Sequence, residues 1–297
     1  MKIRKISVSV FLVTFFVGYI LVLPTKKNVV PIVTTNLASP VLPDPLIETE
    51  NELEIIEKVD DPIDELKYPF KTKLLETGED FSDDEVTAKN GETWLGLFKQ
   101  KENYFLRPTK LKIKRLPNAD KDDLSSEMKK SVKVGGANKP LFLLKNFNAS
   151  KEKSYITTLF QGMTWSDILE HKDQFDFDSY EMLTKLNKDF VGIYKIGGNE
   201  YTLKVIEAKN KSDAKILALV LEGEGQRQII HTVSSKESAD VGYLYWVGDL
   251  DLDGKPDFYL SLYENDNVSA QFIFLSSKAE NGKLIKAVAA FVSYADC

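Results

Sequence analysis

The expected fold depends on the stretch Trp246-Val-Gly-Asp-Leu-Asp-Leu-Asp-Gly-Lys-Pro-Asp-Phe-Tyr-Leu260. Four carboxylates fall at positions 1, 3, 5 and 9 of a loop within it: Asp249, Asp251, Asp253 and Asp257. Alternate side chains turn to one side, and Gly254 at position 6 permits a sharp turn, so the oxygens point to a single centre. The apolar residues on either side predict two β-strands joined by this loop.

The charges of this loop need a partner. Two carboxylates about 4 Å apart repel by roughly 4 kcal/mol at an effective dielectric near 20. Crowding four of them is unfavourable unless a cation, a shared proton or solvent separation offsets the repulsion. Hard Ca²⁺ suits oxygen ligands, and the backbone carbonyl of Lys255 at position 7 could supply one more. The alternative is an acidic surface turn that uses Asp and Gly for their conformational preferences.

Position 12 of the loop is Leu260 rather than the bidentate glutamate of an EF-hand, and strands rather than helices are expected around it. Residues 248–260 instead resemble the loop of FG-GAP and VCBS repeats, which joins two β-strands and holds calcium. The resemblance implies a set of five ligands: Asp249, Asp251, Asp253, Asp257 and the carbonyl of Lys255. The chain has one copy of this loop, so a propeller of several blades is not implied. The region from Trp246 through Ser277 also resembles the end of uncharacterised secreted bacterial proteins, which implies no activity.

The N-terminal 24 residues have the composition of an export signal. Met1 to Lys5 is basic, and residues 6–23 form an uncharged apolar run before Pro24. The run is just long enough to span a bilayer, and no small-x-small cleavage site follows it, which favours an uncleaved signal-anchor over a cleaved signal peptide. The basic flank favours a cytoplasmic N-terminus. The expected location is the cell envelope, anchored in the inner membrane and facing the periplasm, or secreted.

Residues 25–66 are predicted to be a tether. Five prolines favour extended backbone, and a run of acidic residues from Glu48 to Glu65 adds self-repulsion. A short helix within residues 48–59 is compatible with the pattern. The acidic run favours a solvated spacer over a binding site.

Beyond the tether, the pattern predicts a mostly β fold: an antiparallel sandwich or barrel-like sheets with a few short helices, preceded by the N-terminal hydrophobic helix. The expected regions are an N-terminal β region at 67–150, a short helical connection at 151–189, and a C-terminal β region with the calcium loop at 190–297. The connection is expected to hold helices at 164–170 and at 178–186. One continuous domain is equally compatible with the pattern.

Residues 99–145 are rich in basic side chains, including Lys110, Lys112, Lys114, Arg115, Lys129, Lys130 and Lys133. One interpretation is a surface for an anionic polymer or lipid. The other is a solvated strand face balanced by the acidic tether, and the sequence favours this second interpretation.

Few catalytic constellations fit this composition. The net charge of −6 argues against nucleic acid as a partner. His171 and His231 have no partner at metal-ligand spacing, there is no Gly-x-Ser-x-Gly elbow, and Cys297 is the last residue. The sequence therefore favours a membrane-tethered or secreted envelope protein that acts by binding or structure, with an envelope protein or polysaccharide as partner. The alternative is an exported hydrolase with paired carboxylates, Asp249 or Asp257 with Glu264 or Asp266.

Overall fold

The computed structural model describes most of the chain after residue 52. The described residues are 53–57, 59, 61–67, 69–116, 128–136, 138–148, 155–164, 167–168, 182–265, 268–280 and 282–294. All of them belong to one compact unit, Asn51–Cys297. The hydrophobic helix predicted for residues 1–24 and most of the tether predicted for residues 25–66 lie outside the described residues.

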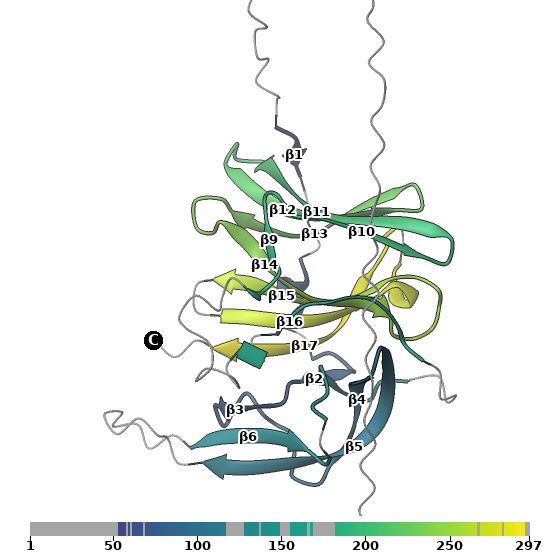
Figure 1. Ribbon diagram of the computed structural model, residues 1–297. Coiled ribbons are helices and arrows are strands. Elements are labelled where there is room, and N and C mark those ends of the chain that lie inside the picture. Colours follow the sequence, from purple (N-terminus) through teal and green to yellow (C-terminus); the bar gives the residue numbers. More distant parts are fainter. Residues whose placement is uncertain are drawn as a thin grey trace, which may run out of the picture. The chain divides into compact units, whose positions relative to one another are not determined.

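The described residues are mostly β, as the sequence predicts, and their strands form three sheets (Figure 1). The first, named here the β10–β13 sheet, comprises β1 (Ile55–Ile56), β10 (Val191–Ile196), β11 (Asn199–Asn210), β12 (Lys215–Gly223) and β13 (Gln226–Ser234). Neighbouring strands from β10 to β13 are antiparallel hairpins, whereas β1 lies parallel to β11. Gly-containing turns connect β10 to β11 and β12 to β13, as expected from their sequence.

The central sheet has the order β17-β16-β15-β14-β8, and β9 also pairs with β14. Its strands are β8 (Thr157–Gln161), β9 (Lys185–Asn187), β14 (Asp240–Asp249), β15 (Asp257–Asn265), β16 (Val268–Leu275) and β17 (Lys286–Tyr294). All of its pairings are antiparallel. The acidic loop is the connection between β14 and β15, in the middle of this sheet.

The third sheet, the β2–β7 sheet, has the order β2-β7-β4-β5-β6-β3. Its strands are β2 (Lys73–Leu75), β3 (Gly78–Phe81), β4 (Thr93–Gln100), β5 (Asn103–Leu116), β6 (Lys129–Val134) and β7 (Leu143–Lys145). The long strand β5 is shared between two partners. Residues 103–110 pair with β4, and residues 111–116 pair with β6.

The central sheet is buried on both faces. One hydrophobic cluster joins it to the β2–β7 sheet, with Tyr259 and Ile273 against residues such as Leu97 and Phe142. A second cluster joins its other face to the β10–β13 sheet through side chains that include Phe258, Phe272, Leu203 and Leu219. Successive residues of β15 alternate between the two clusters, because side chains of a strand point to opposite faces in turn. The three sheets therefore stack as layers, with the central sheet in the middle (Figure 1).

Two strands occupy the described parts of the interval 151–189, which the sequence assigned to a helical connection. β8 and β9 both pair with β14, and residues 185 and 186 of the second predicted helix lie in β9. Asp167 and Ile168 are helical, but most of the two predicted helices lies outside the described residues. Pairing along β14 decides this outcome, because a partner strand far away in sequence overrides local helix preference.

The last part of the predicted tether contacts the β10–β13 sheet. Residues 53–66, which we name the strap, contain β1 and the short helix α1 (Pro62–Glu65). Ile56 packs on a cluster with Ala218 and Val220, and further along the strap Ile63 packs on the cluster between this sheet and the central sheet. Arg227 donates from Nη1 and Nη2 to the carboxylate of Glu54, at 2.5 and 2.8 Å. Burial of these apolar side chains gives the strap a structural role that its prolines and charges do not indicate.

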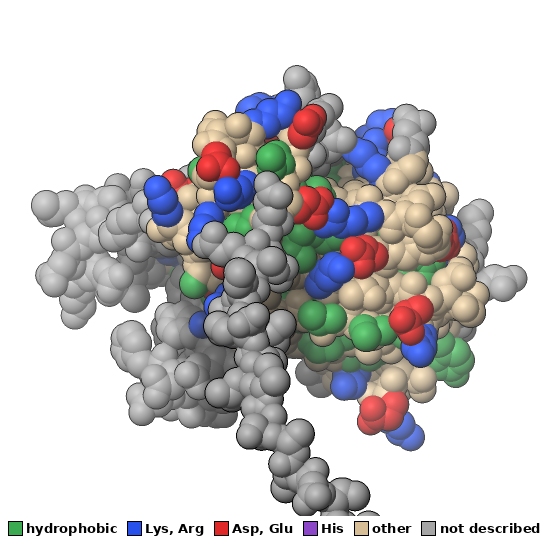
Figure 2. Space-filling model, turned by 90° about the horizontal axis from the view of Figure 1, so that it is seen from above, with side chains coloured by type: hydrophobic (Ala, Val, Ile, Leu, Met, Phe, Trp, Pro, Cys, Tyr) green, Lys and Arg blue, Asp and Glu red, His purple; other side chains and the backbone are tan. Residues whose placement is uncertain are grey.

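Figure 2 shows the face of the molecule that is at the top of Figure 1, with basic and acidic side chains interspersed and a few hydrophobic side chains between them. Ile55, Val191 and Ile193 are the exposed large hydrophobic residues of β1 and β10. Within the part of the chain that the structure describes, no helical segment has the length and apolar character that crossing a bilayer requires.

Candidate metal centre

The acidic loop starts where β14 ends, at Asp249, and finishes where β15 begins, at Asp257. The last pair of the two strands is Gly248 with Asp257. Between them, Leu252 and Gly254 have φ of 66° and 82°. Glycine adopts this left-handed backbone without a steric penalty, whereas leucine does not. The strand pairing on both sides of the loop therefore imposes the tight turn.

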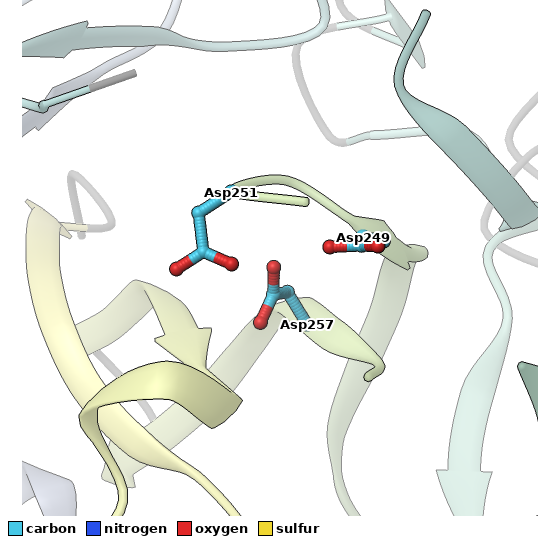
Figure 3. A group of neighbouring side chains, drawn as sticks. All are labelled: Asp249, Asp251 and Asp257. Carbon is cyan, nitrogen blue, oxygen red and sulfur yellow. The ribbon is translucent and has the colours of Figure 1, made fainter. Parts of the chain in front are cut away.

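Three of the predicted carboxylates converge. Asp249, Asp251 and Asp257 each offer an oxygen, and these oxygens lie within 4.8 Å of one another. Figure 3 shows the carboxylates of Asp249 and Asp251 on either side of the Asp257 carboxylate, with all three directed to the same region. Asp249 and Asp257 are 6% and 0% exposed, respectively. The paired strands thus bring together, and largely bury, negative groups whose mutual repulsion would otherwise keep them apart and exposed to water.

Backbone N–H groups of the loop and of Ser276 fix two of these carboxylates. Asp249 accepts from the N–H of Asp253 at 3.0 Å and from that of Gly254 at 2.9 Å. Asp257 accepts from the N–H of Leu250 at 2.7 Å and from that of Ser276 at 2.9 Å. Because each carboxylate uses both oxygens in this way, its orientation is set before any ligand arrives, as in other preorganised sites.

Burial raises the pKa of Asp257 well above its usual range, and the negative charge of Asp251 raises it further. Burial also raises the pKa of Asp249, while the N–H of Gly254 lowers it. Both shifts have the same origin, since a buried carboxylate loses its hydration and sits beside like charges. A bound cation would relieve both costs.

Asp251 provides the observation that tests whether a cation fits. Its Oδ2 accepts from the hydroxyl of Ser277, whereas its Oδ1 is buried without a hydrogen-bond donor among the described residues. A buried carboxylate oxygen without a donor is costly. A hard cation held between Asp249, Asp251 and Asp257 would satisfy this oxygen, so the residues present fit the divalent ion that the sequence predicts.

Asp253 is not part of the group of three. Its Oδ2 accepts from the hydroxyl of Ser276 at 2.9 Å, and its Oδ1 accepts from the N–H of Lys255 at 2.9 Å. Lys255 is expected to contribute only its carbonyl, and its side chain donates to Glu224 at 2.7 Å. The structure therefore brings together three of the five predicted ligands and places Asp253 beside them.

Sequence reasoning missed two residues of the site, Ser276 and Ser277. They belong to the 3-10 helix η2 (Ser276–Lys278), which follows β16. Besides its contact with Asp253, the Ser276 hydroxyl lies 3.1 Å from Oδ1 of Asp257. Register explains their position, because Phe274 of β16 pairs with Phe258 of β15, which brings the end of one strand to the start of the other. Nothing in the local sequence signals this contact.

Two turns of the β10–β13 sheet hold the loop from the other side. Glu224, in the β12–β13 turn, accepts both from Lys255 and from the hydroxyl of Tyr201, the latter at 2.6 Å. Gly197, in the β10–β11 turn, lies against the carbonyl of Gly254. The loop is thus fixed by two sheets.

The residues of the hydrolase alternative do not form a described pair. The side chain of Glu264 and all of Asp266 lie outside the described residues, as do His171 and Cys297. His231 contacts Asp61, with Nδ1 at 2.6 Å from Oδ2, rather than the acidic loop. Comparison of the chain with protein families, with curated proteins and with solved structures finds no match.

Proposed function

We propose that this chain is an exported β protein of the cell envelope that acts by binding or structure, and that its Asp249–Asp257 loop binds calcium as a stabilising ion. The observation that carries the calcium part is the convergence of Asp249, Asp251 and Asp257, with one buried oxygen of Asp251 lacking a donor among the described residues. The envelope location and membrane tether rest on the basic and apolar sequence of residues 1–24.

The ion would act on the stability of the protein. It would join Asp249 at the end of β14 to Asp257 at the start of β15, and Asp257 is itself bonded to Ser276 beyond β16. Three strands of the central sheet would therefore share one ion. Such a site would hold the two strands of a hairpin together, and this structural role accounts for its carboxylates without a catalytic one.

Calcium titration followed by thermal melting tests the proposal. With a Kd of ~10⁻³ M, typical of extracellular modules, calcium at ten times Kd stabilises by about 1.4 kcal/mol. For a chain of this size that raises Tm by roughly 3–6 °C. Asp251→Ala should abolish the rise. Asp213→Ala is the matched control, because Asp213 is an exposed turn residue that pairs only with Lys209 among the described residues.

An absence of calcium-induced stabilisation would contradict the proposal. Unchanged melting of the wild type at millimolar calcium would rule out a structural ion. If Asp251→Ala or Asp257→Ala then also lost hydrolysis of a panel of glycans, the carboxylates would be catalytic and the exported hydrolase would be the better proposal.

A further inference from the structure

A row of lysines follows one face of β5. Lys110, Lys112 and Lys114 are all exposed, while Leu111 between them is buried and Ile113 is partly buried. Leu111 and Ile113 pack in the cluster under the β2–β7 sheet. The row is therefore fixed by the alternation of a strand whose other face is in the core.

Among the described residues, the side chains of the row have no partner, unlike those of their basic neighbours. The ammonium groups of Lys110, Lys112 and Lys114 form no ion pair or hydrogen bond with the described residues. Nearby cations do: Arg115 lies 2.8 Å and Lys130 3.1 Å from Asp83, and Lys133 lies 2.6 Å from Glu79. The protein thus supplies carboxylates to the cations around the row and leaves the row itself without any among the described residues.

Lys112 pairs directly across the strands with Lys133, and like charges at opposite positions destabilise a sheet. Glu79 offsets the charge of Lys133, whereas no described carboxylate contacts Lys112. The chain as a whole carries a net charge of −6, so the row is not a consequence of a basic composition. At physiological ionic strength charges interact over about 8 Å, so a ligand at the row responds to these lysines more than to the net charge.

The shape of the row indicates the class of ligand. Alternate residues of a strand are about 6.7 Å apart, so the three ammonium groups form a line rather than a disc. A line of point charges matches a linear chain with repeated negative groups, whereas a bilayer surface is best matched by a broad cluster. Lysine suits this role because its charge is compact and its stem is flexible.

We propose that Lys110, Lys112 and Lys114 are a docking surface for a linear polyanion, such as an acidic polysaccharide. This site rests on the binding role proposed above and is independent of the calcium loop, which lies in a different sheet.

The probe is a fluorescently labelled heparin oligosaccharide. Its binding to the full-length protein in detergent is followed by fluorescence anisotropy. The wild type should bind at low ionic strength, with the logarithm of affinity falling against the logarithm of salt with a slope of about −2, which is three contacts at ~0.7 each. The triple variant Lys110→Gln, Lys112→Gln, Lys114→Gln should lose about tenfold or more in affinity and most of this slope. Lys112→Gln alone should reduce the slope by about one third.

The control removes the same charge elsewhere. Lys188, Lys211 and Lys236 are exposed and lie outside the β2–β7 sheet, and their triple change to Gln should leave the affinity within about twofold. An equal loss in this control would show that net charge alone matters and would overturn the proposal. Lack of binding by the wild type would overturn it as well. So would binding to phosphatidylglycerol vesicles, dependent on the row, without binding to heparin, because the surface would then be a membrane contact.

The calcium response separates this proposal from the first. The row variant should keep the calcium-induced rise in Tm, which also shows that it is folded. Loss of heparin binding in Asp251→Ala as well as in the row variant would contradict the independence of the two sites.

Discussion

The carbonyl oxygen of Gly254 lies so close to Gly197 that a Cβ on Gly197 would be 2.4 Å from it. Gly254 belongs to the acidic loop of the central sheet, and Gly197 belongs to the β10–β11 turn of the neighbouring sheet. An ion pair between Lys255 and Glu224, at 2.7 Å, is a second contact between the acidic loop and this neighbouring sheet. The geometry of the loop thus depends on a sheet that provides none of its carboxylates.

Gly197→Ala should disturb this contact. The new methyl group meets a backbone atom that cannot move aside, and φ at Gly197 is 59°, so we expect a loss of roughly 2–4 kcal/mol and a smaller calcium-induced rise in Tm. Gly198→Ala is the control. Its φ is 82° but a Cβ there meets nothing within 4 Å, so only the backbone cost of about 1 kcal/mol should remain. Equal effects of the two changes would show that the contact is unimportant. Urea unfolding with and without calcium measures both quantities.

Asp251→Asn and Asp253→Asn should differ in calcium affinity. The resemblance to FG-GAP loops implies that both are ligands, whereas the structure groups Asp251 with Asp249 and Asp257 and bonds Asp253 to Ser276. We therefore expect Asp251→Asn to weaken calcium binding more than Asp253→Asn does. Isothermal titration with calcium gives both affinities. Equal losses would mean that Asp253 turns away from Ser276 when the ion binds.

Stability should fall with rising pH because of Glu76. This side chain is 5% exposed between two sheets and accepts a hydrogen bond from the hydroxyl of Tyr259. Burial raises the pKa of Glu76 from 4.5 to about 7. Since the pKa is higher in the folded state, the stabilising contribution is complete below about pH 4.5 and is lost as the pH rises through about 7. One pKa unit corresponds to about 1.4 kcal/mol, so the loss is up to about 3 kcal/mol.

Glu76→Gln isolates this contribution, because the amide can still accept from Tyr259 and does not ionise. Burial also raises the pKa of Asp240, so the wild type will respond to pH through more than one group. The free energy of unfolding of wild type minus that of the variant should decrease between about pH 5 and pH 8. A difference that stays constant over this range would show that Glu76 does not titrate there.

Asp61 should be the residue that fastens the strap. It accepts from the N–H of Ile63 at 3.0 Å as the cap of α1, and its other oxygen lies 2.6 Å from Nδ1 of His231. His231 is 3% exposed, and its Nε2 has no partner among the described residues. Asp61→Ala removes the cap and leaves a buried ring without a partner, so we expect a loss of roughly 2–4 kcal/mol.

Asp64→Ala is the matched control for Asp61→Ala, because Asp64 is in the same helix and forms an exposed pair with Lys67 at 3.4 Å. It should change stability little. Hydrogen exchange gives a second measurement. The N–H of Lys209 donates to the carbonyl of Glu54 at 2.8 Å, and its protection should fall in Asp61→Ala only. Unchanged exchange would show that β1 stays paired without the Asp61 contact.

The residues of the acidic loop illustrate what was predictable. The spacing of Asp249, Asp251, Asp253 and Asp257 indicated one centre, because local backbone geometry decides where alternate side chains of a tight turn point. The structure groups three of these four carboxylates, without Asp253. The same holds for the hairpins β10–β11, β12–β13 and β14–β15, which apolar runs and glycine-containing turns define locally. Ser276, Ser277 and Glu224 were not predictable, because register and sheet packing bring them to the loop from distant positions.

The strap is a segment for which the prediction from local sequence was incomplete. Its prolines and acidic residues predicted a solvated spacer, yet Ile56 and Asp61 contact the β10–β13 sheet. By itself, the sequence determined that the chain is mostly β and where its cluster of negative charge lies, since both depend on residues close together in the chain. Only the tertiary structure decided that the central sheet is buried on both faces, that β8 and β9 pair with β14 along the edge opposite β15, and which side chains complete the loop. These depend on which apolar faces meet, and burial is non-directional, so no short stretch of sequence encodes the partner.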